Sequence, residues 1–451
     1  MSTNSFIQVP PDGTGKKLQS LQHNIGLNTV QTQVFHLADS TLPTNTQAVD
    51  GRGQAYTRFA EGSPTMDAFG GLRVSDAHIL GGYEYSQADQ AGLFQDQIVS
   101  GASITWVPGT AKTVLNTTGA NGSSVTRTTN RWHFYQPGVG NHVIITLSNG
   151  DSGKSGNIRR WGYFDTQDGL FFELNGTTIN VVLRSSTLGQ EFRVPQSFWN
   201  GDKLDGTGLS GMTLDVTKAN FYWIDYAWLG VGTVRFGVLA PDGSRWVCHT
   251  FQNPNTNVTA YMRTGSLPIR YENFNTSITS GSSDLSLICA AVYSESKTDY
   301  VFWRYADIDS GSITVTSNTH LLSMRPKLET SPGIINRTGI YPDKLDLYVS
   351  GGNVKISIID DATLSGASWQ NATSLAQYDT TATVSGGDRF RTFYLAPGVH
   401  SLDLADIYET NDEGYHVLAD GTGAYTFTVV ATKLDGTTVN VEATLGYREL
   451  N

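Results

Sequence analysis

The stretch Trp199–Gly243 constrains the fold more than any other part of this sequence. It opens with a polar, glycine-punctuated loop and then concentrates aromatic residues within eight positions: Phe221, Tyr222, Trp223, Tyr226 and Trp228. A turn at Gly230 and Gly232 follows, and the next segment alternates apolar residues with others. This pattern predicts a loop, a strand, a tight turn and a second strand, which is a hairpin inside a β-sandwich. Because aromatic side chains bury the most area, we expect the sheets to form around this hairpin.

The segment upstream of this hairpin predicts an antiparallel meander. Three apolar runs, 158–164, 170–174 and 178–184, are separated by Asp168–Gly169 and Asn175–Gly176. Asp and Asn tolerate a positive φ and Gly prefers it, so these dipeptides indicate short hairpin turns. Residues 131–305 contain about ten such strands at short spacing, which is typical of a two-sheet sandwich or jelly roll. A closed barrel is the alternative.

The whole chain is predicted to be all-β. It has 48 glycines and few helix-favouring runs of Leu, Lys and Glu, which argues against helices. Residues 76–335 are assigned to a central antiparallel, lectin-like sandwich or jelly roll. Five or more strands after Tyr341 place a smaller sandwich of immunoglobulin-like size at 336–451. Residues 1–75 are too polar to bury a core and are assigned to an extended attachment arm.

The charge and the ends of the chain exclude several classes of protein. The formal net charge is −11, and an acidic surface repels phosphate, so no nucleic-acid partner is expected. The N-terminus lacks the basic and apolar regions of a signal peptide. No apolar run approaches the ~20 residues that span a bilayer, so no membrane insertion is expected. We therefore expect synthesis in a cytoplasm.

The two cysteines are far apart and fit no metal-binding spacing. Cys248 and Cys289 both lie in apolar, strand-like surroundings. Buried free thiols are the simplest interpretation, and a disulfide between them stays open.

One acidic loop raises the possibility of a calcium site. Asp202, Asp205–Gly206 and Asp215 lie in a glycine-rich segment, and Ca²⁺ requires six to eight oxygen ligands. The EF-hand spacing is absent and Lys203 lies inside the group, so turns between strands explain these residues better. No metal and no cofactor is predicted.

Four further acids are candidates for a hydrolytic pair: Asp165, Asp168, Glu173 and Asp225. Glycoside hydrolysis requires two carboxyl groups that face each other across a cleft. No two of these acids lie two positions apart on the same face of one strand. Asp225 lies among aromatic residues and is expected to pair with Arg235 across the hairpin. No catalytic residue is predicted.

Several tryptophans accompany polar loops and could stack on sugar rings. They are Trp161, Trp199, Trp223, Trp228 and Trp246. Most tryptophans in a sandwich belong to its core, so a glycan site built on any one of them is the less favoured interpretation.

Three segments resemble a family of bacteriophage virion structural proteins found in cyanophages and other marine tailed phages. They are MDAFGGLRVS (66–75), RRWGYFDTQDGLFFELNGTTINVVLRS (159–185) and the run from Trp199 to Gly237. CHTF and LPIRY further along also resemble that family's pattern.

The resemblance implies a non-enzymatic component of a virion, in the tail, baseplate or fibre apparatus. Its partners would be other virion proteins, and it would form a homo-oligomer, with a trimer favoured. The alternatives are a receptor- or glycan-binding protein for host attachment and a capsid decoration protein. A polysaccharide depolymerase is the least favoured.

Overall fold

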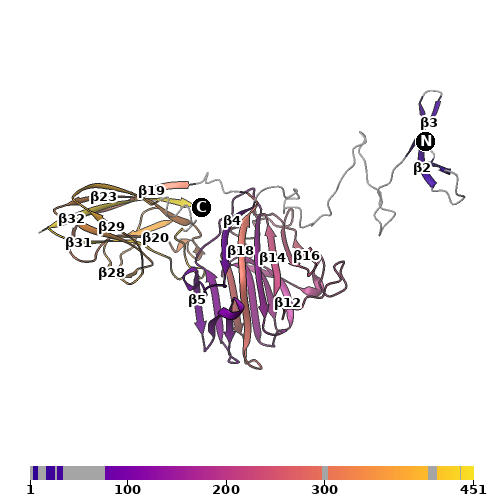
Figure 1. The fold of residues 1–451 in the computed structure, drawn as a ribbon, viewed down its shortest axis with the longest axis horizontal. Helices are drawn as coiled ribbons and strands as arrows, with labels where there is room; N and C mark the ends of the chain where they lie inside the picture. Colours follow the sequence, from indigo (N-terminus) through magenta and orange to yellow (C-terminus); the bar gives the residue numbers. More distant parts are fainter. Residues whose placement is uncertain are drawn as a thin grey trace. The chain divides into compact units, whose positions relative to one another are not determined.

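The structure is a computed structural model that describes residues 4–8, 17–25, 28–33, 77–296, 303–404, 414–436 and 438–450. The chain forms two compact units, Met1–Glu61 and Gly62–Asn451, and each is described by itself. Figure 1 shows that the regular structure of the described chain is β-strand, apart from three short 3₁₀ turns. The predicted all-β class is confirmed.

The first unit contains a three-stranded antiparallel sheet. It consists of β1 (Asn4–Gln8), β2 (Lys17–Ile25) and β3 (Asn28–Gln33), with β2 in the middle. The polar composition does not predict this meander within the assigned arm. The segment MDAFGGLRVS (66–75), which carries part of the family resemblance, lies outside the described residues.

The second unit begins with a central sandwich of two antiparallel sheets. One sheet has seven strands in the order β13 (Gln190–Pro195), β12 (Thr178–Ser185), β11 (Gly169–Asn175), β10 (Asn157–Phe164), β17 (Ile269–Asn275), β8 (Ser124–Thr129) and β5 (Phe94–Val99). The other has eight: β16 (Arg245–Phe251), β15 (Val234–Leu239), β14 (Asn220–Tyr226), β9 (Asn141–Asn149), β18 (Ser283–Ser294), β7 (Lys112–Thr117) and β6 (Ser103–Val107), with β4 (His78–Glu84) also paired to β18.

Three short 3₁₀ turns complete this sandwich: η1 (Ala91–Leu93), η2 (Pro108–Thr110) and η3 (Gln196–Phe198). The described residues contain no α-helix, so none of them forms a helix long and apolar enough to cross a membrane.

The predicted hairpin is confirmed as β14 and β15, and most of its aromatic residues are buried. Tyr222 and Tyr226 point into the core between the two sheets, where Tyr222 packs against Trp161 and Phe172. Trp223 is also buried, but it lies outside that core cluster. The alternation of β14 therefore places large rings on both faces of its sheet.

The smaller C-terminal sandwich also has two sheets. The four-stranded sheet runs β19 (Trp303–Val315), β32 (Val439–Leu450), β23 (Gly339–Ser350) and β30 (Gly398–Asp403). The six-stranded sheet runs β26 (Gln370–Asn371), β27 (Ala376–Asp379), β20 (Thr319–Pro326), β31 (Phe427–Lys433), β24 (Val354–Asp360) and β29 (Asp388–Leu395). Two small pairs are β21 (Glu329–Ser331) with β22 (Ile334–Ile335), and β25 (Thr363–Ser365) with β28 (Thr383–Ser385).

The sheet pairings begin this second sandwich earlier than the division predicted at residues 335 and 336. β19 pairs with β32 along most of its length, and β20 lies between β27 and β31. Sequence periodicity shows where strands lie, but it does not show which strands pair. For that reason the sequence-based division places β19 and β20 in the preceding sandwich.

The two cysteines differ in their surroundings. Both are free thiols; Cys248 is buried and donates from Sγ to the carbonyl of Phe236 at 3.1 Å, whereas Cys289 is exposed. The expectation of a buried thiol is confirmed for Cys248 and wrong for Cys289.

Gly237 tests the packing of the hairpin. A Cβ at this position would overlap the Trp223 ring and the Trp246 carbonyl. We expect Gly237→Ala to lower the free energy of unfolding by about 1–3 kcal/mol, measured by urea denaturation. Gly82→Ala is the control, because a Cβ there meets nothing within 4 Å. An equal loss in both variants would contradict the packing argument.

Candidate binding site between the two β-sandwiches

A buried ion-pair cluster joins the central sandwich to the segment that leads into β23. The Arg337 guanidinium donates from Nε and Nη2 to Asp165 Oδ2 at 2.8 and 2.6 Å, and from Nη2 to Asp168 Oδ2 at 3.0 Å. Both carboxylates are fully buried. They also cap local turns, since Asp165 accepts from the Asp168 amide and Asp168 accepts from Ser186. A guanidinium in this planar arrangement fixes orientation as well as charge.

Further hydrogen bonds cross the same junction. Trp132 Nε1 donates to the carbonyl of Val417 at 2.8 Å, and the Tyr425 hydroxyl donates to Asn130 Oδ1 at 2.5 Å. Gln97 Nε2 donates to Asp420 Oδ2 at 2.6 Å. Residues of the C-terminal sandwich therefore bond both to β5 and to the segment that follows β8 in the central one.

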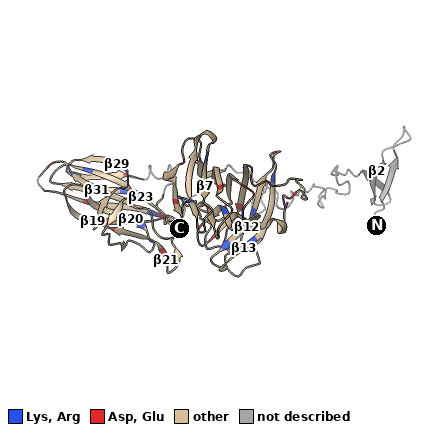
Figure 2. Cartoon of the chain, turned by 90° about the horizontal axis from the view of Figure 1, so that it is seen from below, with Lys and Arg blue, Asp and Glu red and all other residues tan. Residues whose placement is uncertain are grey.

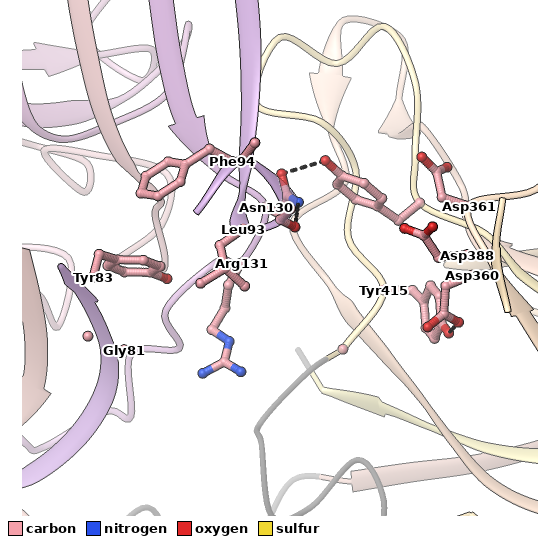
Figure 3. Close-up of a pocket in the computed structure, with 15 residues that line it drawn as sticks. Gly81, Tyr83, Leu93, Phe94, Asn130, Arg131, Asp360, Asp361, Asp388 and Tyr415 are labelled. Carbon is pink, nitrogen blue, oxygen red and sulfur yellow. Dashed lines mark hydrogen bonds between the residues drawn. The ribbon is translucent and has the colours of Figure 1, made fainter. Parts of the chain in front are cut away.

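A cavity of about 730 Å³ lies beside these contacts. Figure 3 shows its residues, which come from both sandwiches. The central sandwich supplies parts of β4, η1 and the start of β5, together with Asn130 and Arg131. The C-terminal sandwich supplies the ends of β24 and β29, together with Gly414, Tyr415 and Tyr425. This volume lies within the usual range of ligand pockets, which often form at such junctions.

Three carboxyl groups lie on the C-terminal side of the cavity: Asp360, Asp361 and Asp388. Strand pairing brings them together, because β24 ends where β29 begins and Asp360 is the partner of Asp388 in the register. The backbone of Asp361 is left-handed, with φ of 51°, and its amide donates to the carbonyl of Thr426 at 2.8 Å. The Tyr415 hydroxyl donates to Asp360 Oδ1.

The electrostatics of this wall are those of crowded acids. Partial burial raises the pKa of Asp361, and the neighbouring charge of Asp388 raises it further. Burial also raises the pKa of Tyr425, with added contributions from Asp361 and Asp96. The Tyr425 hydroxyl therefore stays protonated near neutrality, which agrees with its role as donor to Asn130.

The central sandwich presents a different chemistry to the cavity. Asn130 Nδ2 donates to the carbonyl of Gly92 at 2.9 Å, and Arg131 Nη1 donates to the carbonyl of Leu80 at 3.1 Å. Leu93 contributes an apolar surface that is 41% exposed. A Cβ added to Gly82 or Gly92 would meet no heavy atom within 4 Å, so the backbone itself borders open space there.

Together these groups can bind a polar ligand that donates several hydrogen bonds. An ionised carboxylate only accepts hydrogen bonds, whereas an amide both donates and accepts. A ligand that matches this cavity must offer hydroxyl or ammonium groups to the acids and an apolar side to Leu93. Polyhydroxylated molecules such as sugars have this combination.

The structure does not bring the predicted calcium candidates together. Asp205 and Asp215 each accept from the amide and hydroxyl of the threonine two positions later, at 2.9 and 2.6 Å. Asp202 accepts from the amides of Leu204 and Ser210. Hydrogen bonds from Thr207 lower the pKa of Asp205. Within the described ranges, no three acids, histidines or cysteines form a group that could hold a metal ion.

The acids considered for hydrolysis are separated and held in ion pairs. Glu173 is fully buried and accepts from Arg160 and Arg193 on the seven-stranded sheet, where Figure 2 shows blue residues at β12 and β13. Asp225 pairs with Arg235 directly across the hairpin, as predicted. Asp165 and Asp168 belong to the Arg337 cluster. Each carboxylate thus has a structural partner.

The tryptophans considered for sugar stacking are not exposed. Trp161, Trp199 and Trp223 are buried, and Trp228 and Trp246 are partly buried against the core. A packing role is therefore the better interpretation of these tryptophans.

Sequence reasoning missed the acids of the cavity. Asp360 and Asp361 directly follow the alternating segment 354–359, and two acids at the end of such a strand were a usable signal. Asp388 lies 27 positions after Asp361, and only the pairing of β24 with β29 shows that they are neighbours.

Removal of Arg337 should loosen the junction. Arg337→Ala leaves two buried carboxylates without their cation, so we expect a loss of about 3–5 kcal/mol in the free energy of unfolding. Lys344→Ala is the control, because Lys344 and its partner Asp346 are 54% and 45% exposed, with Nζ 3.1 Å from Oδ1. Its loss should stay below ~1 kcal/mol. Urea denaturation measures both, and similar losses would contradict the structural role of Arg337.

Two buried histidines near the cavity should make stability depend on pH. Burial lowers the pKa of both His133 and His416 to about 3. In the unfolded chain both histidines protonate near pH 6.5. Their contribution to the free energy of unfolding is therefore present above that pH and is lost as the pH falls toward 3. We expect about 2 kcal/mol of lost stability per histidine between pH 7 and pH 5.

The variant His416→Leu isolates one histidine. Neither ring nitrogen of His416 has a hydrogen-bond partner within the described part of the chain, so the substitution removes no bond there. Urea denaturation at pH 7 and pH 5 should show a smaller pH dependence in His416→Leu than in the wild type. An unchanged pH dependence would show that His416 does not contribute to the pH dependence of stability.

Comparisons with known proteins identify no family for this chain. No protein-family model matches it, and no curated protein matches it. Among solved structures, it is similar to the carbohydrate recognition domain of Emp47p, with 13% identity, a TM-score of 0.32, and coverage of 49% of this chain and 99% of that one. A legume lectin-like domain from Entamoeba histolytica gives 8% identity, a TM-score of 0.32, and coverage of 49% and 99%. A protein of unknown function from Shewanella oneidensis MR-1 has 7% identity and a TM-score of 0.32, with coverage of 52% of this chain and 93% of that one. The β-sandwich fold rests on this chain's own sheets, and these similarities decide neither ligand nor activity.

Proposed function

We propose that the protein is a non-enzymatic recognition protein that binds a carbohydrate in the cavity between its two sandwiches. The observation that carries this proposal is the lining of that cavity. Carboxylates, an amide, an apolar side chain and bare glycine backbone face one space of about 730 Å³. Sugar hydroxyls can donate to the acids while the C–H face of a sugar ring packs on Leu93.

The four acids considered for hydrolysis support recognition over catalysis. Each is engaged by an arginine at a structural position, with Arg337 on Asp165 and Asp168, Arg160 and Arg193 on Glu173, and Arg235 on Asp225. The non-enzymatic role remains a proposal.

We propose a phage particle as the setting of this recognition. The support is the resemblance of residues 66–75, 159–185 and 199–237 to phage virion structural proteins. In that setting, residues 1–75 attach the protein to other virion proteins and the sandwiches meet host surface glycans. Deletion of residues 1–60 should abolish incorporation into particles but leave the sandwiches folded. Normal incorporation of the truncated chain would count against the attachment role.

The carbohydrate proposal is tested by filling the cavity. Gly82 lines the cavity, a Cβ there meets no heavy atom within 4 Å, and its backbone has no positive φ, so the phenyl ring of Gly82→Phe occupies open space at the cavity wall. We expect at least a tenfold loss of affinity, or about 1.4 kcal/mol, for the polysaccharides that the wild-type chain retains on an array of bacterial surface glycans. Asp388→Asn should weaken the same interactions.

Gly109→Phe is the matched control. Gly109 also borders open space, but it lies in η2 outside the cavity lining. Equal binding by Gly82→Phe and Gly109→Phe would move the site elsewhere. If the wild-type chain bound no glycan at high micromolar concentration, the proposal would fail.

A further inference from the structure

β29 connects the cavity with an exposed edge of the C-terminal sandwich. The strand starts at Asp388 in the cavity wall and runs to Leu395. It is the last strand of its six-stranded sheet, and in the described part of the chain it pairs only with β24. One row of its backbone N–H and C=O groups therefore has no partner strand there. Such an edge can bond to an extended molecule.

Several side chains along this strand are exposed, including a large aromatic one. Tyr394 is 71% exposed and lies opposite Lys355 in the register. Arg389 and Arg391 are also exposed, and within the described residues no salt bridge engages either guanidinium. In a chain of net charge −11, two exposed arginines on this strand and a lysine opposite its exposed tyrosine are a local exception. Long edge strands of β-sheets usually carry charged side chains that prevent pairing with other strands, but that role does not require an exposed aromatic ring.

The chemistry of the strip complements that of the cavity. The cavity acids accept hydrogen bonds, whereas the guanidiniums supply donors in a fixed planar arrangement. Tyr394 offers an apolar ring face and a hydroxyl. At ~3.3 Å per residue, Tyr394 lies about 20 Å along the strand from Asp388. A single sugar in the cavity cannot span that length, but a polymer can.

We propose that β29 extends the cavity into a strip that binds further units of a polysaccharide chain, with Arg389 and Tyr394 as its contacts. This inference rests on the proposed carbohydrate function and specifies its ligand as a polymer held along the strand. The terminal or branching unit occupies the cavity, and the chain runs past Arg389 toward Tyr394. Occupancy of the strip adds affinity with each unit until Tyr394 is reached.

The test compares long and short forms of one glycan. The probes are the polysaccharide that the wild-type chain retains most strongly on the array, together with its mono-, di- and hexasaccharide fragments. Calorimetry with the full chain should show affinity rising from monosaccharide to hexasaccharide. Tyr394→Ala should lower the affinity for the hexasaccharide at least fivefold and leave the affinity for the monosaccharide unchanged. Arg389→Gln should act in the same direction.

Tyr348→Ala is the matched control. Tyr348 is 53% exposed in β23, which belongs to the other sheet of the same sandwich. It should leave every affinity unchanged.

The outcomes distinguish glycan binding in the cavity from polysaccharide binding along β29. If Gly82→Phe abolishes binding but Tyr394→Ala and Arg389→Gln do not change the length dependence, the cavity binds glycan and the strip does not. If no fragment or polymer binds, both proposals fall. If instead Tyr394→Ala changes only the self-association seen in sedimentation, the edge is a protein-docking strand, and the polysaccharide strip is overturned.

Discussion

The pairing of Arg337 with Asp165 and Asp168 is the interaction on which the candidate site depends. Both carboxylates are fully buried in turns of the central sandwich, so the cation must come to a fixed place. Arg337 lies two residues before β23 begins, and that strand pairs with both β30 and β32. A charge cluster of this kind adds little net stability compared with apolar packing. Its contribution is orientation, because a planar guanidinium shared by two carboxylates tolerates few geometries.

The cavity follows from that orientation. Its two walls belong to different sandwiches, and neither wall alone encloses a ligand. Asn130 takes part in both the junction and the lining, since it accepts from Tyr425 and borders the cavity. The hydrogen bonds that hold the sandwiches together are therefore adjacent to those that a ligand would use. Binding and the relative placement of these walls should be energetically coupled.

The sequence was informative wherever a signal was local. Alternation and turn dipeptides predicted β10 to β12 and the β14–β15 hairpin, and they also predicted the cross-strand pairing of Asp225 with Arg235. These follow from neighbours within a few positions. The assignment of β19 and β20 failed because sheet membership depends on partners more than a hundred residues away, at β32 and β31. The cavity acids were missed for the same reason, since Asp388 joins Asp360 only through strand pairing.

The backbone at Asp361 limits what evolution or design can place in this wall. A left-handed φ of 51° is accessible to asparagine and glycine at small cost, but it strains β-branched and bulky side chains. Asparagine keeps the shape of the side chain and removes the charge. Aspartate and asparagine both fit this backbone, so related chains could have either an acidic or a neutral cavity wall at this position with the same loop conformation. A ligand preference could change there by one substitution while the fold stays the same.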